Sequence, residues 1–192
     1  MVEITTDPFP VLFTERLILR EPTVNDTASL FDLRSDVEVM KYVPREPAKN
    51  SDDIRIFMNI VVEWHKTKLA VLWAMCERNN PGYLLGTIGF WKFDFGSCRS
   101  EVGYMMNQRY QGKGFMSEAM NRVLTYGFDE LNLHSVEARV DEENFASIKV
   151  VEKAGFLREG CLKESVLNKG EFRNDLIFSL LKKNFKPVPS VG

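Results

Sequence analysis

The sequence has 192 residues, of which 44% are hydrophobic and 27% are charged, as is ordinary for a globular protein with one substantial core. The chain carries 25 Lys and Arg against 27 Asp and Glu, so no global basic field favours nucleic acid as a partner. Its longest apolar runs fall far below the roughly 20 residues that a membrane span needs.

Cysteine, histidine and the N-terminal segment also limit the class of protein. The three cysteines, Cys76, Cys98 and Cys161, are widely spaced, and neither of the two histidines is near them. This pattern argues against a disulfide framework and against a metal site. Residues 1–10 lack the charged-then-apolar pattern of an export signal. We therefore predict no metal and a cytoplasmic protein.

Apolar periodicity and turn residues predict eleven elements in one mixed α/β domain spanning residues 1–186. The predicted strands are 14–20, 71–77, 83–95, 101–106, 134–140, 156–166 and 172–181. The predicted helices are 26–34, 51–68, a helix that follows residue 114 and ends near 130, and one that Asn144 caps and Gly155 stops. Residues 187–192 are predicted to be a disordered tail.

A short glycine loop, Arg109-Tyr110-Gln111-Gly112-Lys113-Gly114, stands between a predicted strand and a predicted helix. Two glycines around a lysine at such a turn expose consecutive backbone N–H groups at the positive end of the helix dipole, which suits a phosphate. The loop has the spacing neither of a P-loop nor of the dinucleotide fingerprint, so nucleotide binding is a distant alternative.

A second motif follows about thirty residues later, in which Asn144-x-x-Ser147 precedes Glu152-Lys153-Ala154-Gly155-Phe156. Together, the two motifs resemble those of the GNAT superfamily of N-acetyltransferases, over roughly residues 12–182. Further stretches resemble its ribosomal-protein N-terminal acetyltransferase (RimJ/RimL-like) subgroup. These stretches are 14–20, 36–40, 86–89 and 158–160.

The resemblance implies a mostly antiparallel, twisted central sheet with one splayed parallel strand pair, flanked by about four helices. It also implies that acetyl-CoA lies in the splay. The residues expected to bind it are Met105 and Met106 along the strand, Arg109, Gln111, Gly112, Lys113 and Gly114 around the pyrophosphate, and Asn144 at the pantetheine. Backbone N–H groups of the splayed strand would polarise the thioester carbonyl.

Direct transfer to an amine needs a base and an acid. By resemblance, Glu101 is the candidate base; the alternative is a carboxylate that faces solvent or pairs with an arginine. Many superfamily members carry an acidic tyrosine seven residues after the motif asparagine, where this chain has Val151. Ser147 is the substitute acid, unless it is only a small residue that lets CoA approach.

Other residues near the two motifs have less specific expectations. Tyr104 is expected either near the acceptor channel or as a packing residue of a central strand. The ribosomal-protein subgroup carries a carboxylate near Val166, and Glu164 would share that strand face if the strand were regular. The three tryptophans are expected in the core or in the acceptor-site wall.

The predicted function is acetyl-CoA-dependent N-acetyltransfer, with the α-amine of a protein or peptide N-terminus as the acceptor. A small amine, such as a polyamine, amino acid or antibiotic, is one alternative. A non-catalytic acyl-CoA-binding module is another, kept open by the missing tyrosine at Val151. A homodimer is compatible with the sequence, but no residue argues for it.

Overall fold

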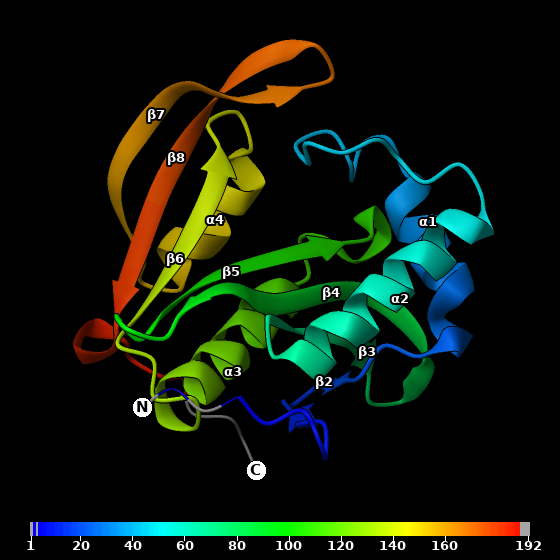
Figure 1. Ribbon diagram of the computed structural model, residues 1–192, viewed down its shortest axis with the longest axis horizontal. Helices are drawn as coiled ribbons and strands as arrows, with labels where there is room; N and C mark the ends of the chain where they lie inside the picture. The colour runs from blue at the N-terminus through cyan, green and yellow to red at the C-terminus, as the bar shows by residue number, and fades with distance from the viewer. Residues whose placement is uncertain (1, 3, 189–192) are drawn as a thin grey trace.

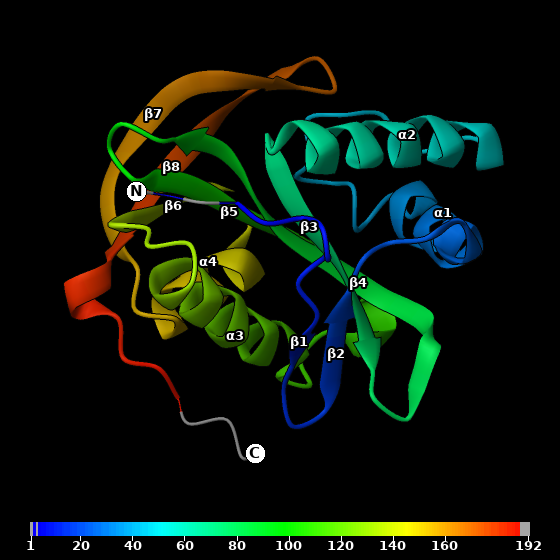
Figure 2. The ribbon, with the colours of Figure 1, turned by 60° about the horizontal axis from the view of Figure 1, so that its bottom comes forward.

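The computed structural model describes residues 2 and 4–188 of the chain, which form one sheet with two helices on each face (Figures 1 and 2). The strands are β1 Leu12–Phe13, β2 Leu17–Arg20, β3 Ala70–Glu77, β4 Asn80–Asp94, β5 Arg99–Met106, β6 Ser135–Asp141, β7 Leu157–Asn168 and β8 Glu171–Leu181. The helices are α1 Thr27–Ser35, α2 Ser51–Thr67, α3 Phe115–Asp129 and α4 Phe145–Lys153, with short 3-10 turns at Val24–Asp26, Gln108–Tyr110 and Lys182–Asn184.

The eight-stranded sheet has the order β1-β2-β3-β4-β5-β6-β8-β7, and every neighbouring pair is antiparallel except β5 and β6. The predicted fold class, a mostly antiparallel sheet with a single parallel pair and four helices, is confirmed. No helix within the described residues is both long and apolar enough to cross a membrane.

Two hydrophobic clusters hold the helices to the sheet. Helices α1 and α2 cover one face, where Leu30, Ile54 and Val61 pack on buried side chains of β3. Helices α3 and α4 cover the other face, where Met120 and Val151 belong to the larger cluster (Figure 2). Because side chains alternate across a strand, β3 supplies residues to both clusters and is buried on both faces.

The helix boundaries follow from local capping chemistry. The Asn50 side chain accepts hydrogen bonds from the N–H groups of Asp52 and Asp53 and begins α2, and the left-handed conformation of Lys68 ends it. At α4, the Asn144 side chain accepts from the Ser147 N–H, and Gly155 follows the helix with a φ of 93°. Both helices therefore begin and end where the sequence predicts.

The first predicted strand, residues 14–20, is wrong over its first half. The chain turns at Thr14, whose N–H donates to the Leu17 carbonyl at 3.0 Å, and this turn separates β1 from β2. The Thr14 hydroxyl also donates to Glu118 at 2.5 Å. The hydrogen bond to Glu118, which is distant in the sequence, thus favours a turn where the residue pattern predicts a strand.

Smaller differences concern strand ends and the tail. Strand β4 begins at Asn80, inside the predicted turn. A bulge at the end of β3 shifts the register, so that the pairing of the two strands extends to Glu77 and Asn80. The predicted tail begins at residue 187, but the backbone of Val188 makes two hydrogen bonds with the Asn121 side chain, at 2.9 and 3.0 Å. Residues 189–192 lie outside the described part of the chain.

Candidate functional site

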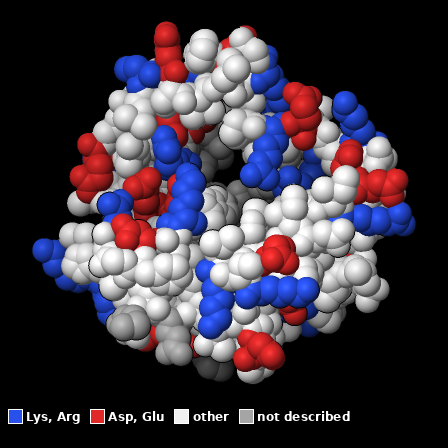
Figure 3. Space-filling view, viewed as in Figure 1, with Lys and Arg blue, Asp and Glu red and all other residues white. Residues whose placement is uncertain are grey.

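A fork between β5 and β6 forms the centre of the candidate site. The two strands pair in parallel only from Arg99 to Glu101 and from Ser135 to Glu137. Beyond this segment β5 continues along β4 while β6 continues along β8, so the strands separate (Figure 1). Beyond Glu101, this edge of β5 has no strand partner among the residues that the structure describes, and a cleft of about 1490 Å³ opens there. Figure 3 shows this hollow, with basic and acidic side chains both around it.

The glycine loop lies at one mouth of this cleft. Gly112 and Gly114 have φ values of 73° and 82°, a left-handed conformation that favours glycine. Among the described residues, no acceptor takes the backbone N–H of Gly112, Lys113 or Gly114. The loop therefore presents free donors at the start of α3, as the sequence predicts for a phosphate seat.

Arg16, which the sequence analysis did not single out, holds this loop against α3. Its side chain donates to the Lys113 carbonyl at 3.0 Å and to the Glu118 carboxylate at 2.7 Å. The guanidinium also lies 4.4 Å from the centre of the Phe115 ring. The pKa of Glu118 is lowered although burial alone would raise it, because Thr14 and Arg16 donate hydrogen bonds to its carboxylate. This cluster fixes the N-terminal end of α3.

The open edge of β5 carries the two methionines expected at the pantetheine. Met105 and Met106 both line the cleft. The Met106 carbonyl already accepts a hydrogen bond from the Gln111 side chain at 3.0 Å, so this carbonyl is not free. The Gln111 side chain thus ties the glycine loop to the end of β5.

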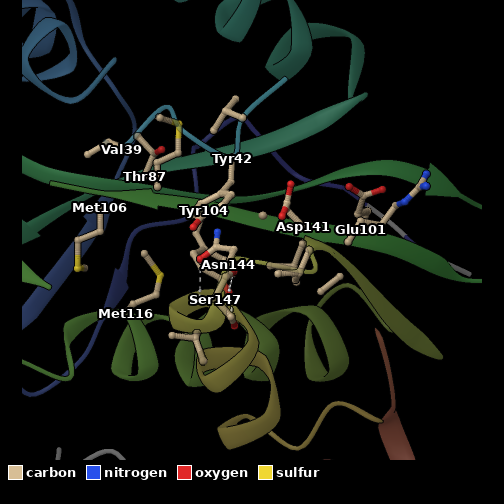
Figure 4. A pocket seen from close by; sticks show the side chains of 18 of the residues that line it. Val39, Tyr42, Thr87, Glu101, Tyr104, Met106, Met116, Asp141, Asn144 and Ser147 are labelled. Carbon is tan, nitrogen blue, oxygen red and sulfur yellow. Dashed lines mark hydrogen bonds between the residues drawn. The ribbon is translucent and has the colours of Figure 1, made fainter. Parts of the chain in front are cut away.

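Beneath the fork, a serine and a tyrosine form a hydrogen-bonded pair (Figure 4). The Tyr104 hydroxyl of β5 lies 2.6 Å from the Ser147 Oγ of α4, and either atom can be the donor. The Tyr104 hydroxyl is also 3.2 Å from the Ser147 carbonyl. Burial raises the pKa of Tyr104 to about 12, so the phenol stays protonated at neutral pH. Tyr104 is therefore a hydrogen-bond partner of Ser147. The sequence analysis expected it near the acceptor channel or as a packing residue and did not predict this contact.

The position seven residues after Asn144 holds Val151, not a tyrosine. The Val151 side chain is fully buried in the core and does not line the cleft. A phenol from the strand stands next to Ser147 instead. Asn144 uses its Oδ1 to cap α4, which leaves its Nδ2 available to donate into the cleft it lines.

Glu101 lies at the closed end of the fork, where β5 and β6 still pair. Its Oε1 accepts from the Trp91 indole N–H at 2.9 Å, and its Oε2 accepts from the Lys92 ammonium at 2.7 Å. Gly103 makes room for the Trp91 ring, since a Cβ there would lie 1.8 Å from a ring carbon. Glu101 lines the cleft, as predicted, but both of its oxygens already have partners.

Two further carboxylates, from Asp141 and Asp175, line the same wall of the cleft. Burial raises the pKa of Asp175, which Arg139 partly offsets through an ion pair of 2.6 Å. The negative charge of Glu101 raises the pKa of Asp175 further, so the two carboxylates are close enough to interact. Asp141 pairs with Arg173 at 3.1 Å. The sequence analysis missed both aspartates, since neither stands in a recognisable motif.

The opposite wall comes from α1, α2 and the segment between them. Residues lining the cleft there include Arg34, Tyr42, Arg45, Phe57 and Trp64. The segment reaches across to the β7–β8 hairpin: the Asn168 side chain donates to the Lys41 carbonyl at 2.9 Å, and the Lys169 ammonium lies 3.4 Å from the Met40 carbonyl. These contacts close the cleft on one side.

Eight of the ten predicted site residues line this one cleft: Glu101, Met105, Met106, Gln111, Gly112, Gly114, Asn144 and Ser147. Arg109 and Lys113 do not line it. Their side chains are exposed, and the Lys113 ammonium lies 5.3 Å from the centre of the Tyr110 ring.

The expectation that Glu164 shares the strand face of Val166 is wrong. Strand β7 is irregular between Leu162 and Val166, and Glu164 has a φ of 49°. Val166 lines the cleft and Glu164 does not.

Comparisons with known proteins agree with this geometry. Residues 16–157 match the family model described as an acetyltransferase (GNAT) domain. An uncharacterized N-acetyltransferase of Bacillus licheniformis, p20, is 34% identical over 91% of this chain and 97% of its own length. A crystal structure of a GNAT-family acetyltransferase from Bacillus anthracis is 32% identical, covers 91% of this chain and 99% of its own, and superposes with a TM-score of 0.80.

A further relative has a stated acceptor. The spermidine N(1)-acetyltransferase of Vibrio cholerae is 26% identical over 83% of this chain and 89% of its own length. The fork, the loop of free amides and these relatives lead to one conclusion. The chain belongs to the GNAT family and is an N-acetyltransferase.

Proposed function

We propose that this enzyme transfers the acetyl group of acetyl-CoA directly to the α-amine of a protein or peptide N-terminus. The observation that carries the proposal is the fork between β5 and β6, which has free loop amides at its mouth and the Ser147–Tyr104 pair beneath it. The cleft is large enough for a cofactor arm and an acceptor together.

The chain offers donors for the pyrophosphate, the pantetheine and the thioester of acetyl-CoA, which supplies an activated acetyl group. The N–H groups of Gly112, Lys113 and Gly114 would hold the pyrophosphate, with Arg109 and Lys113 adding positive charge nearby. Asn144 Nδ2 and the unpaired edge of β5 at Met105 and Met106 would hold the pantetheine. Backbone N–H groups of that edge would stabilise the negative charge that develops on the carbonyl oxygen.

Ser147 and Tyr104 are the proposed proton donors to the departing sulfur. As the amine nitrogen bonds to the carbonyl carbon and the carbon–sulfur bond breaks, the Ser147 hydroxyl gives its proton to the thiolate. The Tyr104 phenol, 2.6 Å away, replaces that proton on Ser147 Oγ. The second proton that the nitrogen loses on becoming an amide returns through water to the Tyr104 oxygen, which the relay leaves deprotonated. Because burial keeps the phenol protonated at neutral pH, the pair is ready to act as an acid.

Glu101 is the proposed base that takes the proton from the incoming ammonium. Its carboxylate lines the cleft, and the contacts from Lys92 and Trp91 hold it in one orientation. Asp175 is the rival base on the same wall, since burial raises its pKa toward a useful value. If Glu101→Gln lowers kcat by about a hundredfold or more while Asp175→Asn has a smaller effect, Glu101 is the base. Full turnover by Glu101→Gln would remove it from this role.

The charge of the cleft favours an α-amine over a polycation. On the wall formed by α1, α2 and their neighbouring segments, the charged residues that line the cleft are the basic Arg34, Lys41, Arg45 and Lys68 and the acidic Glu38. A polyamine would bring several positive charges among them, whereas an N-terminus brings one. Acetylation of spermidine is the second candidate, because a relative carries that activity in its name. The three free cysteines support a reducing location, and we propose the cytoplasm.

Mass spectrometry of acetyl transfer to a mixed acceptor pool tests the proposal. The pool would contain peptides that vary in their first residues, N-terminally blocked peptides with free lysines, amino acids and spermidine. Acetylation of free N-termini with a first-residue preference is the expected result, and the Ser147→Ala variant should label the same acceptors more slowly. Acetylation of spermidine alone would refute the acceptor class. Binding of acetyl-CoA with no product from any amine would favour a non-catalytic module.

A further inference from the structure

Arg34 lines the cleft on the wall of α1 and α2 and contacts Met105 of the open strand. It belongs to the last turn of α1. Its guanidinium carbon stands 4.0 Å from the centre of the Phe57 ring, and its Nη1 lies 3.8 Å from the Met105 sulfur. The aromatic ring and the methionine hold the guanidinium in place. Arg34 is therefore a fixed cation next to the β5 edge that borders the transfer point.

No carboxylate neutralises this cation. Within the described residues, Arg34 has no Asp or Glu oxygen within 4.0 Å. The partly buried arginines Arg20 and Arg173 each have at least one. Its charged neighbour is instead Arg45, also on the cleft wall. Burial, and after it the charge of Arg45, lowers the pKa of Arg34 to about 10, so the group is still charged at neutral pH.

A charge that is partly removed from water and lacks a partner is unfavourable, and a bound anion relieves this cost. Guanidinium groups bind carboxylates through two parallel hydrogen bonds, in a geometry that an ammonium group does not reproduce. One wall of the cleft thus carries a positive charge that a bound anion would neutralise. The other wall carries Asp175 together with Glu101 and Asp141, the latter two labelled in Figure 4. Each of these carboxylates already has a cationic partner, unlike the guanidinium of Arg34.

We propose that Arg34 binds a carboxylate of the acceptor, so that the preferred acceptor is an amine with a carboxylate a few bonds away. This inference rests on the proposed acetyl transfer to an amine and narrows its substrate class. The carboxylate can belong to an acidic residue next to a peptide N-terminus or to a free amino acid. In both cases the amine faces the carboxylate wall and the anion faces Arg34.

The first test uses the wild-type enzyme and pairs of acceptors that differ only in charge. One pair is a peptide with Asp or Glu in its second position against the same peptide with Asn or Gln. The other is an amino acid against its C-terminal amide. The expected result is a kcat/KM at least about tenfold higher for the carboxylate member of one pair, in line with a charged hydrogen bond. The pair that shows it identifies the source of the carboxylate.

The second test assigns this preference to Arg34. Arg34→Met keeps an unbranched side chain against Phe57 and removes the charge. It should raise KM for the carboxylate acceptor about tenfold or more, abolish the discrimination within the pair, and leave KM for acetyl-CoA within about twofold. Arg34→Lys should recover only part of the preference. Arg55→Met, which removes an exposed arginine of α2 paired with Asp52, is the matched control and should retain the preference.

Three results would overturn the inference. Equal kcat/KM within both acceptor pairs would refute it while leaving acetyl transfer intact, and this needs no variant. A higher KM for acetyl-CoA in Arg34→Met, with the acceptor preference retained, would assign Arg34 to the cofactor. No transfer to any amine by the wild-type enzyme would refute the proposed function and this inference with it.

Discussion

At the scale of single residues, the site depends on contacts between side chains that are far apart in the sequence. Tyr104 and Ser147 are 43 residues apart, and Arg34 and Met105 are 71 apart. The glycine loop and the Asn144 cap could be predicted, because each is a local pattern whose backbone geometry follows from its own residues. The Tyr104–Ser147 pair could not, since it depends on how α4 packs beneath β5.

Removal of the Tyr104 hydroxyl tests the proton relay. We expect Tyr104→Phe to lower kcat by about tenfold to a hundredfold and to leave KM for acetyl-CoA nearly unchanged, because the ring still packs but no longer replaces the serine proton. The double variant with Ser147→Ala should be little slower than Ser147→Ala alone, since the two residues act as a unit. Steady-state kinetics with a fixed acceptor gives these values. Fully additive losses would contradict a relay.

At the scale of elements, the loop between β5 and α3 combines glycines in the left-handed conformation with free amides. Gly112 has a φ of 73° and no atom within 4 Å of a Cβ built on it, so a side chain there is strained without a clash. Gly170, in the turn between β7 and β8, has a φ of 85° and the same open surroundings, but it does not line the cleft. The two glycines therefore form a matched pair.

Replacing each of these glycines with alanine distinguishes an effect on backbone strain from an effect on CoA binding. Both Gly112→Ala and Gly170→Ala should lower the free energy of unfolding by about 1 kcal/mol, because each places a Cβ in the left-handed region. Only Gly112→Ala should weaken CoA binding in calorimetric titration, by about tenfold or more, since the loop must shift its amides. Equal CoA affinities in the two variants would argue against a pyrophosphate seat at this loop.

Two elements differ from the strands that their sequence patterns predict. Residues 14–16 have an extended pattern, yet they turn because Thr14 and Arg16 bind Glu118 of α3. The bulge in β7 likewise turns Glu164 away from the cleft. Long-range hydrogen bonds and strand irregularities are set by the assembled sheet, and no short sequence pattern announces them.

At the scale of the whole molecule, an ion pair between β2 and the start of α1 ties the N-terminal elements to the sheet. Asp26 is fully buried and accepts two hydrogen bonds from Arg20, at 2.6 and 2.8 Å. Burial alone would raise the pKa of Asp26, but the bonds from Arg20 and Thr23 outweigh it and the pKa is lowered. The pair therefore stabilises the fold above the pKa of an unfolded aspartate and is lost as the pH falls through the folded value.

Asp26→Asn should lower the free energy of unfolding by about 3 kcal/mol at pH 7, because it leaves Arg20 largely buried without a counter-charge. Its stability should also fall less than that of the wild type between about pH 5 and pH 3. Urea titrations across this range measure both effects. Asp52→Asn, in an exposed pair with Arg55, should change stability by less than about 1 kcal/mol. Parallel pH profiles for wild type and Asp26→Asn would contradict the account.

The overall architecture was accessible from the sequence because its motifs are local and because they resemble those of one family. The closure of the cleft could not be predicted from the sequence. It depends on contacts between the segment that joins α1 to α2 and the β7–β8 hairpin, whose contacting residues are 127 and 129 positions apart in the sequence. Tyr42 and Arg45 of this segment line the cleft, so this part of its wall could not be predicted from local patterns.

Hydrogen–deuterium exchange with and without acetyl-CoA tests most directly whether the fork holds the cofactor. We predict that acetyl-CoA slows exchange in residues 102–106 of β5 and in residues 111–115 around the loop. Over residues 102–106, β5 pairs on one side only, with β4, and the N–H groups of Gly112, Lys113 and Gly114 have no acceptor among the described residues. Residues 18 and 19 of β2, already paired with β1 on one side and β3 on the other, should not change. Saturating acetyl-CoA that protects some other region and leaves these two segments unchanged would contradict the account.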